Sequence, residues 1–206
     1  EMSVLFSDMR NFTMISEKLS PQQSFKFLNN YLDKMTPAIN DNQGFIDKYI
    51  GDAIMALFPN EPDDAVQAAI EMNKALKLLN KDKASDHVNM GIGIHMGTLV
   101  LGTIGKDTRM ETTVISDTVN SSARLESLNK VYGTSILISG GVRFSLSDSL
   151  QSQSRLIDLT AVKGKSAIWL DDEKNRTVVT GSNTSICDVD RFYRSGSRNG
   201  ASFNNP

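Results

Sequence analysis

The sequence predicts an α+β fold of the ferredoxin-like (palm-like) type, an antiparallel sheet with two packed helices on one face. The first observation is the order of local patterns, which runs strand, helix, strand, strand, helix, strand over residues 3–95. The second is a tight turn at residues 50–52 between two apolar runs, which is typical of a β-hairpin. The third is the spacing of apolar residues by three and four in both helical segments, which places one stripe of each helix on a core.

The first strand is the short apolar run Ser3–Ser7, which ends at Asp8. The first helix begins at residues 20–23, because Ser20 suits the N-cap, Pro21 suits the first helical position and Gln23 can close a capping box. Its apolar stripe consists of Phe25, Leu28, Leu32, Met35 and Ile39.

The hairpin consists of strands Phe45–Tyr49 and Ala53–Phe58, with Asp52 near its tip. A second helix covers Ala65–Leu79, and the alternating run Val88–His95 predicts a strand whose antiparallel partner is Leu99–Ile104. The remaining predicted elements are a strand at 112–115, a helix at 117–128 and strands at 135–138, 156–162 and 167–170.

The bulk composition predicts one folded domain with a tail. The chain has 206 residues, of which 39% are hydrophobic, and a net charge of −2, which gives no positive field for nucleic acid or an anionic membrane. Cys187 is the only cysteine, which fits a reducing, cytoplasmic compartment. We expect a domain over residues 1–170 and a disordered tail or linker over 171–206, where apolar periodicity disappears. We also expect an excised domain, with regulatory domains and any membrane anchor elsewhere in the parent chain.

Two aspartates stand where a metal site could form. Asp8 closes an apolar strand and Asp52 lies at the hairpin tip, and in a ferredoxin-like sheet the first strand lies beside that hairpin. Carboxylate oxygens suit Mg²⁺ or Mn²⁺, which keep positions open for water and phosphate. Backbone N–H groups at the start of the helix that follows Asp8 offer an anion site for a triphosphate.

Five segments of the chain together resemble the catalytic domain of the class III nucleotidyl cyclases, in the family's order and roughly its spacing. They are FSDMRNFT, FIDKYIGDAIMALF, GIGIHMG, TTVISDTVNSSARLE and VKGK. The resemblance covers about residues 3–170. It implies an adenylyl cyclase that converts ATP into 3′,5′-cyclic AMP and pyrophosphate by attack of the ribose 3′-hydroxyl on the α-phosphate.

The resemblance also implies site residues. Asp8 and Asp52 match the aspartates that bind two divalent metal ions (Mg or Mn), and Met9 matches a residue that offers its backbone carbonyl. Asn11, Phe12 and Thr13 match the phosphate loop.

Lys48 and Thr113 match the pair that reads the purine, in the form found in a bacterial-type, ATP-specific subgroup. A lysine ammonium only donates, so it suits adenine N1 better than the N1–H of guanine. Asn120 and Arg124 match the pair that stabilises the transition state, and Lys163 matches a lysine that holds the terminal phosphates. The family builds each site from both subunits of a dimer, so a head-to-tail homodimer is expected.

Two alternatives remain open. One is a guanylyl cyclase that uses GTP, against which Lys48 argues. The other is a catalytically silent module for dimerisation or nucleotide sensing, against which the presence of Asp8, Asp52, Asn120 and Arg124 argues.

Overall fold

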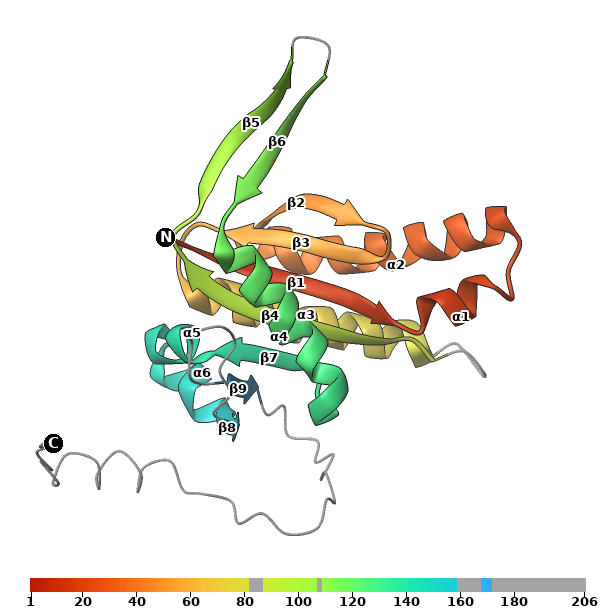
Figure 1. Ribbon diagram of the computed structural model, residues 1–206. Helices are drawn as coiled ribbons and strands as arrows, with labels where there is room; N and C mark the ends of the chain where they lie inside the picture. The colour runs from red at the N-terminus through yellow and green to blue at the C-terminus, as the bar shows by residue number, and fades with distance from the viewer. Residues whose placement is uncertain (82–86, 107–108, 159–167, 172–206) are drawn as a thin grey trace, which may run out of the picture. The chain divides into compact units, whose positions relative to one another are not determined.

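A computed structural model describes residues 1–81, 87–106, 109–158 and 168–171 (Figure 1). Up to residue 97 its elements are β1 (Met2–Arg10), α1 (Phe12–Ser16), α2 (Pro21–Asp41), β2 (Phe45–Ile50), β3 (Ala53–Phe58), α3 (Pro62–Lys81) and β4 (Asn89–Gly97). The elements that follow are β5 (Val100–Lys106), β6 (Arg109–Ile115), α4 (Asp117–Tyr132), β7 (Ile136–Ser139), α5 (Gly140–Ser145), α6 (Asp148–Gln153), β8 (Ser154–Asp158) and β9 (Ile168–Asp171).

The described strands form a seven-stranded sheet in the order β2-β3-β1-β4-β7-β9-β8 and a separate ribbon of β5 and β6. β1 lies between β3 and β4 and is antiparallel to both. This confirms the predicted ferredoxin-like arrangement, in which the first strand lies beside the hairpin. β7 adds to β4 in parallel, β9 pairs antiparallel with β7, and β8 pairs antiparallel with β9 at the edge of the sheet.

The predicted pairing of Leu99–Ile104 with Val88–His95 is wrong. Both edges of β4 are occupied, one by β1 and the other by β7, so β4 has no free edge for β5. β5 pairs instead with β6, from Val100 opposite Ile115 to Lys106 opposite Arg109.

Helices cover both faces of the sheet, whereas the sequence predicted helices on one face only. The long helices α2 and α3 share a face, and the hydroxyl of Tyr31 in α2 donates to Sδ of Met90 in β4 over 3.0 Å. α4 lies across the opposite face, in front of β1 and β4 in Figure 1. There the hydroxyl of Ser122 donates to the carbonyl oxygen of Val4 over 3.0 Å.

Glycines in β4 allow α4 to approach the sheet closely. A Cβ added to Gly93 would collide with main-chain atoms of α4, the carbonyl oxygen of Ser122 and the nitrogen of Glu126. A Cβ added to Gly91 would collide with the side chains of Arg10 and Glu126. The GIGIHMG segment is therefore the surface on which α4 rests.

The capping box that begins α2 is confirmed, since the hydroxyl of Ser20 accepts from the Gln23 nitrogen over 3.3 Å and the Gln23 side chain accepts from the Ser20 nitrogen over 2.9 Å. Met35 and Ile39 of its apolar stripe are fully buried, but Phe25 is 69% exposed, so its assignment to the core was wrong. Phe25 lies in the first turns of the helix, before α2 meets the sheet.

Several boundaries also differ from expectation. β1 is longer than the apolar run that predicted it, and the short helices α5 and α6 were not predicted. The predicted strand at 156–162 is described only as far as Asp158, in β8, and the tail from residue 172 lies outside the described residues. Within the described part of the chain, no helix has the length and apolar character needed to cross a bilayer.

Candidate active site

The two predicted metal-binding aspartates lie together. Asp8 is half-buried in β1, on the α4 face, and Asp52 follows Gly51, whose positive φ of 64° forms the turn of the hairpin. The pKa of Asp52 is raised from 3.8 to about 6, first by burial and then by the negative charge of Asp8, against hydrogen bonds from the backbone N–H groups of Asp52 and Met9. Neighbouring carboxylates of this kind repel each other unless a cation lies between them.

The residues around this pair fit a divalent cation. Asp8 and Asp52 provide hard oxygen ligands, the type that Mg²⁺ and Mn²⁺ prefer. The backbone N–H of Met9 donates to the carboxylate of Asp52, so the main chain of Met9 borders the site.

Tyr31 is a buried residue within electrostatic reach of the carboxylate pair, and the sequence analysis did not select it. Its phenol is fully buried on the α2 side of the sheet. Burial raises the pKa of Tyr31, and the charges of Asp52 and then Asp8 raise it further. The phenol therefore stays neutral, and its hydroxyl donates to Sδ of Met90. Its place as a single polar group in an apolar helix stripe could have drawn attention to it.

The predicted phosphate loop follows β1 directly. Asn11 precedes α1 in the left-handed conformation (φ 61°), and its carbonyl oxygen accepts from the Ile15 nitrogen over 3.1 Å. Phe12 stacks on Phe27 of α2, with ring centroids 6.4 Å apart. Asn11 and Thr13 are exposed, so the loop presents polar groups next to Asp8.

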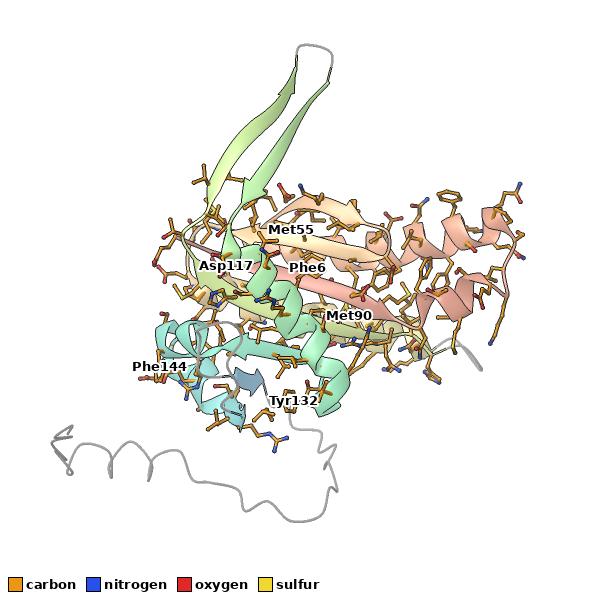
Figure 2. The ribbon with its side chains drawn as sticks, viewed as in Figure 1. Phe6, Met55, Met90, Asp117, Tyr132 and Phe144 are labelled. Atoms are coloured by element: carbon orange, nitrogen blue, oxygen red, sulfur yellow. The ribbon has the colours of Figure 1, made fainter. Side chains whose placement is uncertain are left out.

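Lys48 lies on the same sheet face as Asp8. It pairs with Met55 of β3, and Met55 pairs with Phe6 of β1, two residues before Asp8. Met55 and Phe6 pack with Val4, Leu57, Leu99, Val114 and Val119 in one apolar cluster. Figure 2 labels Phe6 and Met55 of this cluster, which also includes Val119 of α4.

The other predicted purine-reading residue, Thr113, is in β6, where its backbone pairs with Gly102. The next residue, Val114, packs in the apolar cluster that includes Met55, the pairing partner of Lys48. The sequence neighbour of Thr113 and the pairing partner of Lys48 thus belong to the same apolar cluster.

Lys48 forms an ion pair that the sequence did not predict. Its Nζ lies 3.2 Å from Oδ2 of Asp47, whose side chain is 5% exposed, against 36% for Lys48. Adjacent residues in a regular strand point to opposite faces. Here the register shifts between Ile46 and Lys48, and Asp47 is the extra residue of a β-bulge.

Asn120 and Arg124 lie one helical turn apart in α4. The side of α4 that meets the sheet consists of Thr118, Ser121, Ser122, Leu125, Glu126 and Asn129. At about 100° per residue, Asn120 and Arg124 lie on nearly the opposite side. Asn120 is exposed and Arg124 half-buried, and in a single chain they do not face Asp8 and Asp52. Lys163, the predicted terminal-phosphate ligand, lies outside the described residues.

A buried ion pair ties α4 to β1 beside the aspartates. Nη1 of Arg10 lies 3.0 Å from Oε1 of Glu126, with side-chain exposures of 13% and 4%, and Nη2 donates to the Glu126 carbonyl oxygen over 3.3 Å. Burial raises the pKa of Glu126, while Arg10 lowers it. Spacing alone gives no signal for this pair, whose members are 116 positions apart.

Comparisons with known proteins agree with this geometry. Residues 1–178 match the adenylate and guanylate cyclase catalytic domain. An adenylate cyclase of Anabaena cylindrica is 46% identical over 173 residues, which cover 80% of this chain and 34% of that protein. The chain thus spans about a third of the length of this curated relative.

Solved structures of adenylyl cyclases and of guanylyl cyclases are both similar to this chain. A bacterial light-regulated adenylyl cyclase superimposes with a TM-score of 0.78 at 25% identity, over 86% of this chain and 53% of that one. The guanylyl cyclase Cya2 superimposes with a TM-score of 0.70 at 33% identity, over 90% of this chain and 96% of that one. With its ferredoxin-like sheet and paired aspartates, the chain belongs to the adenylate and guanylate cyclase catalytic domain family.

Proposed function

We propose that this domain converts ATP into 3′,5′-cyclic AMP and pyrophosphate, with two divalent metal ions, as a homodimer. The observation that carries the proposal is the placement of Lys48 on the sheet face of Asp8, with Asp52 beside Asp8. One face of one sheet thereby offers a cation site for phosphates and a donor for a purine.

Asp8, Asp52 and the main chain of Met9 would hold the metal ions. Bound there, Mg²⁺ or Mn²⁺ would lower the pKa of the ribose 3′-hydroxyl and compensate the negative charge on the leaving pyrophosphate. The loop of Asn11, Phe12 and Thr13 follows Asp8 directly and would orient the phosphates with backbone N–H groups. Lys163 is proposed to bind the terminal phosphates.

The preference for ATP rests on Lys48. Its ammonium carries three donors and no acceptor, so it can donate to adenine N1 but meets another donor at guanine N1–H. We assign Thr113 to the exocyclic amino group of adenine, which a hydroxyl can accept from. The apolar cluster of Met55, Phe6 and Val114 would supply a surface for the purine ring.

The direction in which Asn120 and Arg124 face supports the proposed dimer. Because they lie on the side of α4 away from their own sheet, they would complete the site of a second chain. The fixed fork of Arg124 suits charge that develops on phosphate oxygens in the transition state. Exposed apolar residues on the edge strand β2 and on β5 give such a partner a surface: Phe45, Tyr49, Ile50, Val100 and Leu101.

Product formation from Mn·ATP tests the enzyme claim, with the Asp52→Ala variant as control. We expect cyclic AMP from the wild type and none from the variant at equal fold and oligomeric state. A folded dimer that makes no more product than Asp52→Ala would show that the proposal is wrong.

Mixing inactive variants tests the shared site. Asp52→Ala and Arg124→Ala remove residues from opposite halves of each site, so a mixed dimer keeps one intact site of two. Random exchange should restore about a quarter of wild-type activity, because half of the dimers are mixed. No recovery after demonstrated subunit exchange would contradict a site built from two chains.

Guanylyl cyclase activity is the second candidate, favoured by the likeness to the guanylyl cyclase Cya2 at 33% identity. Parallel assays with ATP and GTP decide between them. A higher kcat/KM for GTP would overturn the role of Lys48 as an adenine donor.

A further inference from the structure

We infer that Asp47 is a positioning residue that fixes the Lys48 ammonium for purine recognition and thereby sets the preference for ATP over GTP. The inference rests on the proposed function, because it assumes that Lys48 reads the purine. It concerns a residue that would act through its neighbour rather than by contact with substrate.

The backbone explains how the two side chains meet. Ile46 pairs with Ala56 and Lys48 pairs with Met55, which leaves Asp47 as an extra residue in β2. A β-bulge of this kind re-aims a side chain and allows neighbours to point to similar sides of the strand. The carboxylate of Asp47 can therefore reach the ammonium of the next residue, 3.2 Å away.

The pair is asymmetric in its access to solvent. The Asp47 side chain is 5% exposed, whereas Lys48 is 36% exposed and can reach a ligand. Oδ2 of Asp47 is buried and accepts no hydrogen bond of good geometry. A buried carboxylate is unfavourable without a compensating charge, so the ammonium of Lys48 is held near it.

This anchoring suits a specificity role. A lysine has a flexible four-carbon stem, and ordering it upon binding costs conformational entropy. With one side of the ammonium drawn to Asp47, the ammonium has a defined position before adenine N1 reaches it. A fixed donor also rejects guanine, because it cannot swing away from the N1–H that opposes it. Without Asp47, Lys48 would bind ATP less well and tolerate GTP better.

The test is the Asp47→Asn variant, which keeps the shape of the side chain and removes its charge. We expect KM for ATP to rise roughly three- to tenfold and the ATP-to-GTP ratio of kcat/KM to fall by a similar factor, as for loss of one charge-assisted contact. The kcat at saturating ATP should change little. Asp41→Asn, an exposed aspartate at the end of α2, is the matched control and should behave as wild type.

A double-variant comparison separates positioning from a merely structural effect. In the Lys48→Met background, Asp47→Asn should cause no further loss of nucleotide selectivity, since the group it acts through is gone. If Asp47→Asn does not fold, Asp47→Glu takes its place. That variant keeps the charge but displaces it by one methylene, and it should show a smaller loss in the same direction.

The outcomes distinguish this inference from the function on which it rests. A protein without cyclase activity would overturn both. An active, ATP-selective enzyme whose KM and selectivity are unchanged in Asp47→Asn would overturn the inference alone. An additive loss of selectivity in the Lys48→Met background would also overturn it, because Asp47 would then act by another route.

Discussion

The Gly93→Ala variant is expected to lose stability and turnover together, because Gly93 lies where α4 comes closest to the sheet. An added Cβ would collide with the Ser122 carbonyl oxygen and the Glu126 nitrogen, and would lie 2.9 Å from the Leu125 carbonyl carbon. All three are main-chain atoms, so no change of side-chain rotamer relieves the overlap. The helix itself must shift, at a cost of about 1–3 kcal/mol.

The shift should reach the active site, because α4 carries Asn120 and Arg124. A displacement of about 1 Å in a catalytic group can lower the rate by about 10²-fold. We therefore expect a fall in kcat of at least about tenfold in Gly93→Ala. Binding of Mn²⁺ should change little, since Asp8 and Asp52 belong to β1 and the hairpin.

Urea denaturation measures the stability loss, as a lower midpoint at constant slope. Activity is then measured well below both thermal midpoints, with Tm expected to fall by about 2–4 °C for each kcal/mol. Gly102→Ala is the matched control, since its Cβ would meet nothing within 4 Å. A Gly93→Ala protein with the stability and kcat of Gly102→Ala would refute the close approach of α4. A destabilised variant with unchanged kcat would refute the link between α4 and turnover.

Three further predictions concern the pKa of Asp52, the buried ion pair and the start of α2. The stability that Asp52 contributes in metal-free buffer is present below its ordinary pKa of 3.8 and is lost as pH rises through about 6. The stability advantage of Asp52→Asn over wild type should therefore grow across that window, and a constant difference would contradict it. Arg10→Met should lower the free energy of unfolding by about 3–5 kcal/mol in urea denaturation, because it leaves Glu126 buried without its cation. Adding Glu126→Leu to this variant should recover most of the lost stability. A double variant as unstable as Arg10→Met alone would contradict the reasoning. Ser20→Ala should cost about 1 kcal/mol by the same measurement, and no loss would mean that the capping box does not stabilise α2.

Local patterns predicted the first half of the fold well. The order of elements, the capping box of α2 and the hairpin with Asp52 at its tip follow from spacing and turn chemistry that act over a few residues. The ferredoxin-like order then follows because few arrangements of these elements bury both helices against one sheet. Asp8 and Asp52 are neighbours for the same reason.

The layer formed by α4 could not be predicted in this way. Most residues that α4 buries are polar or small, including Thr118, Ser121, Ser122 and Asn129, so hydrophobic periodicity does not show which side packs. The partners of β5 were mispredicted because strand pairing depends on which edges other strands have already occupied. Phe25 shows the same limit, since an apolar stripe does not tell where along a helix its contact with the sheet begins.

The sequence by itself determined the family and the identities of the residues on which the proposed chemistry depends. It did so because the motifs retain the order and the residue types that metal, phosphate and purine contacts require. Only the tertiary structure decided which of these residues share a face. It placed Asp47 against Lys48 through a bulge, joined Arg10 to Glu126 across 116 positions and turned Asn120 and Arg124 away from their own sheet. These relations depend on register and on the packing of distant segments, which local sequence does not encode.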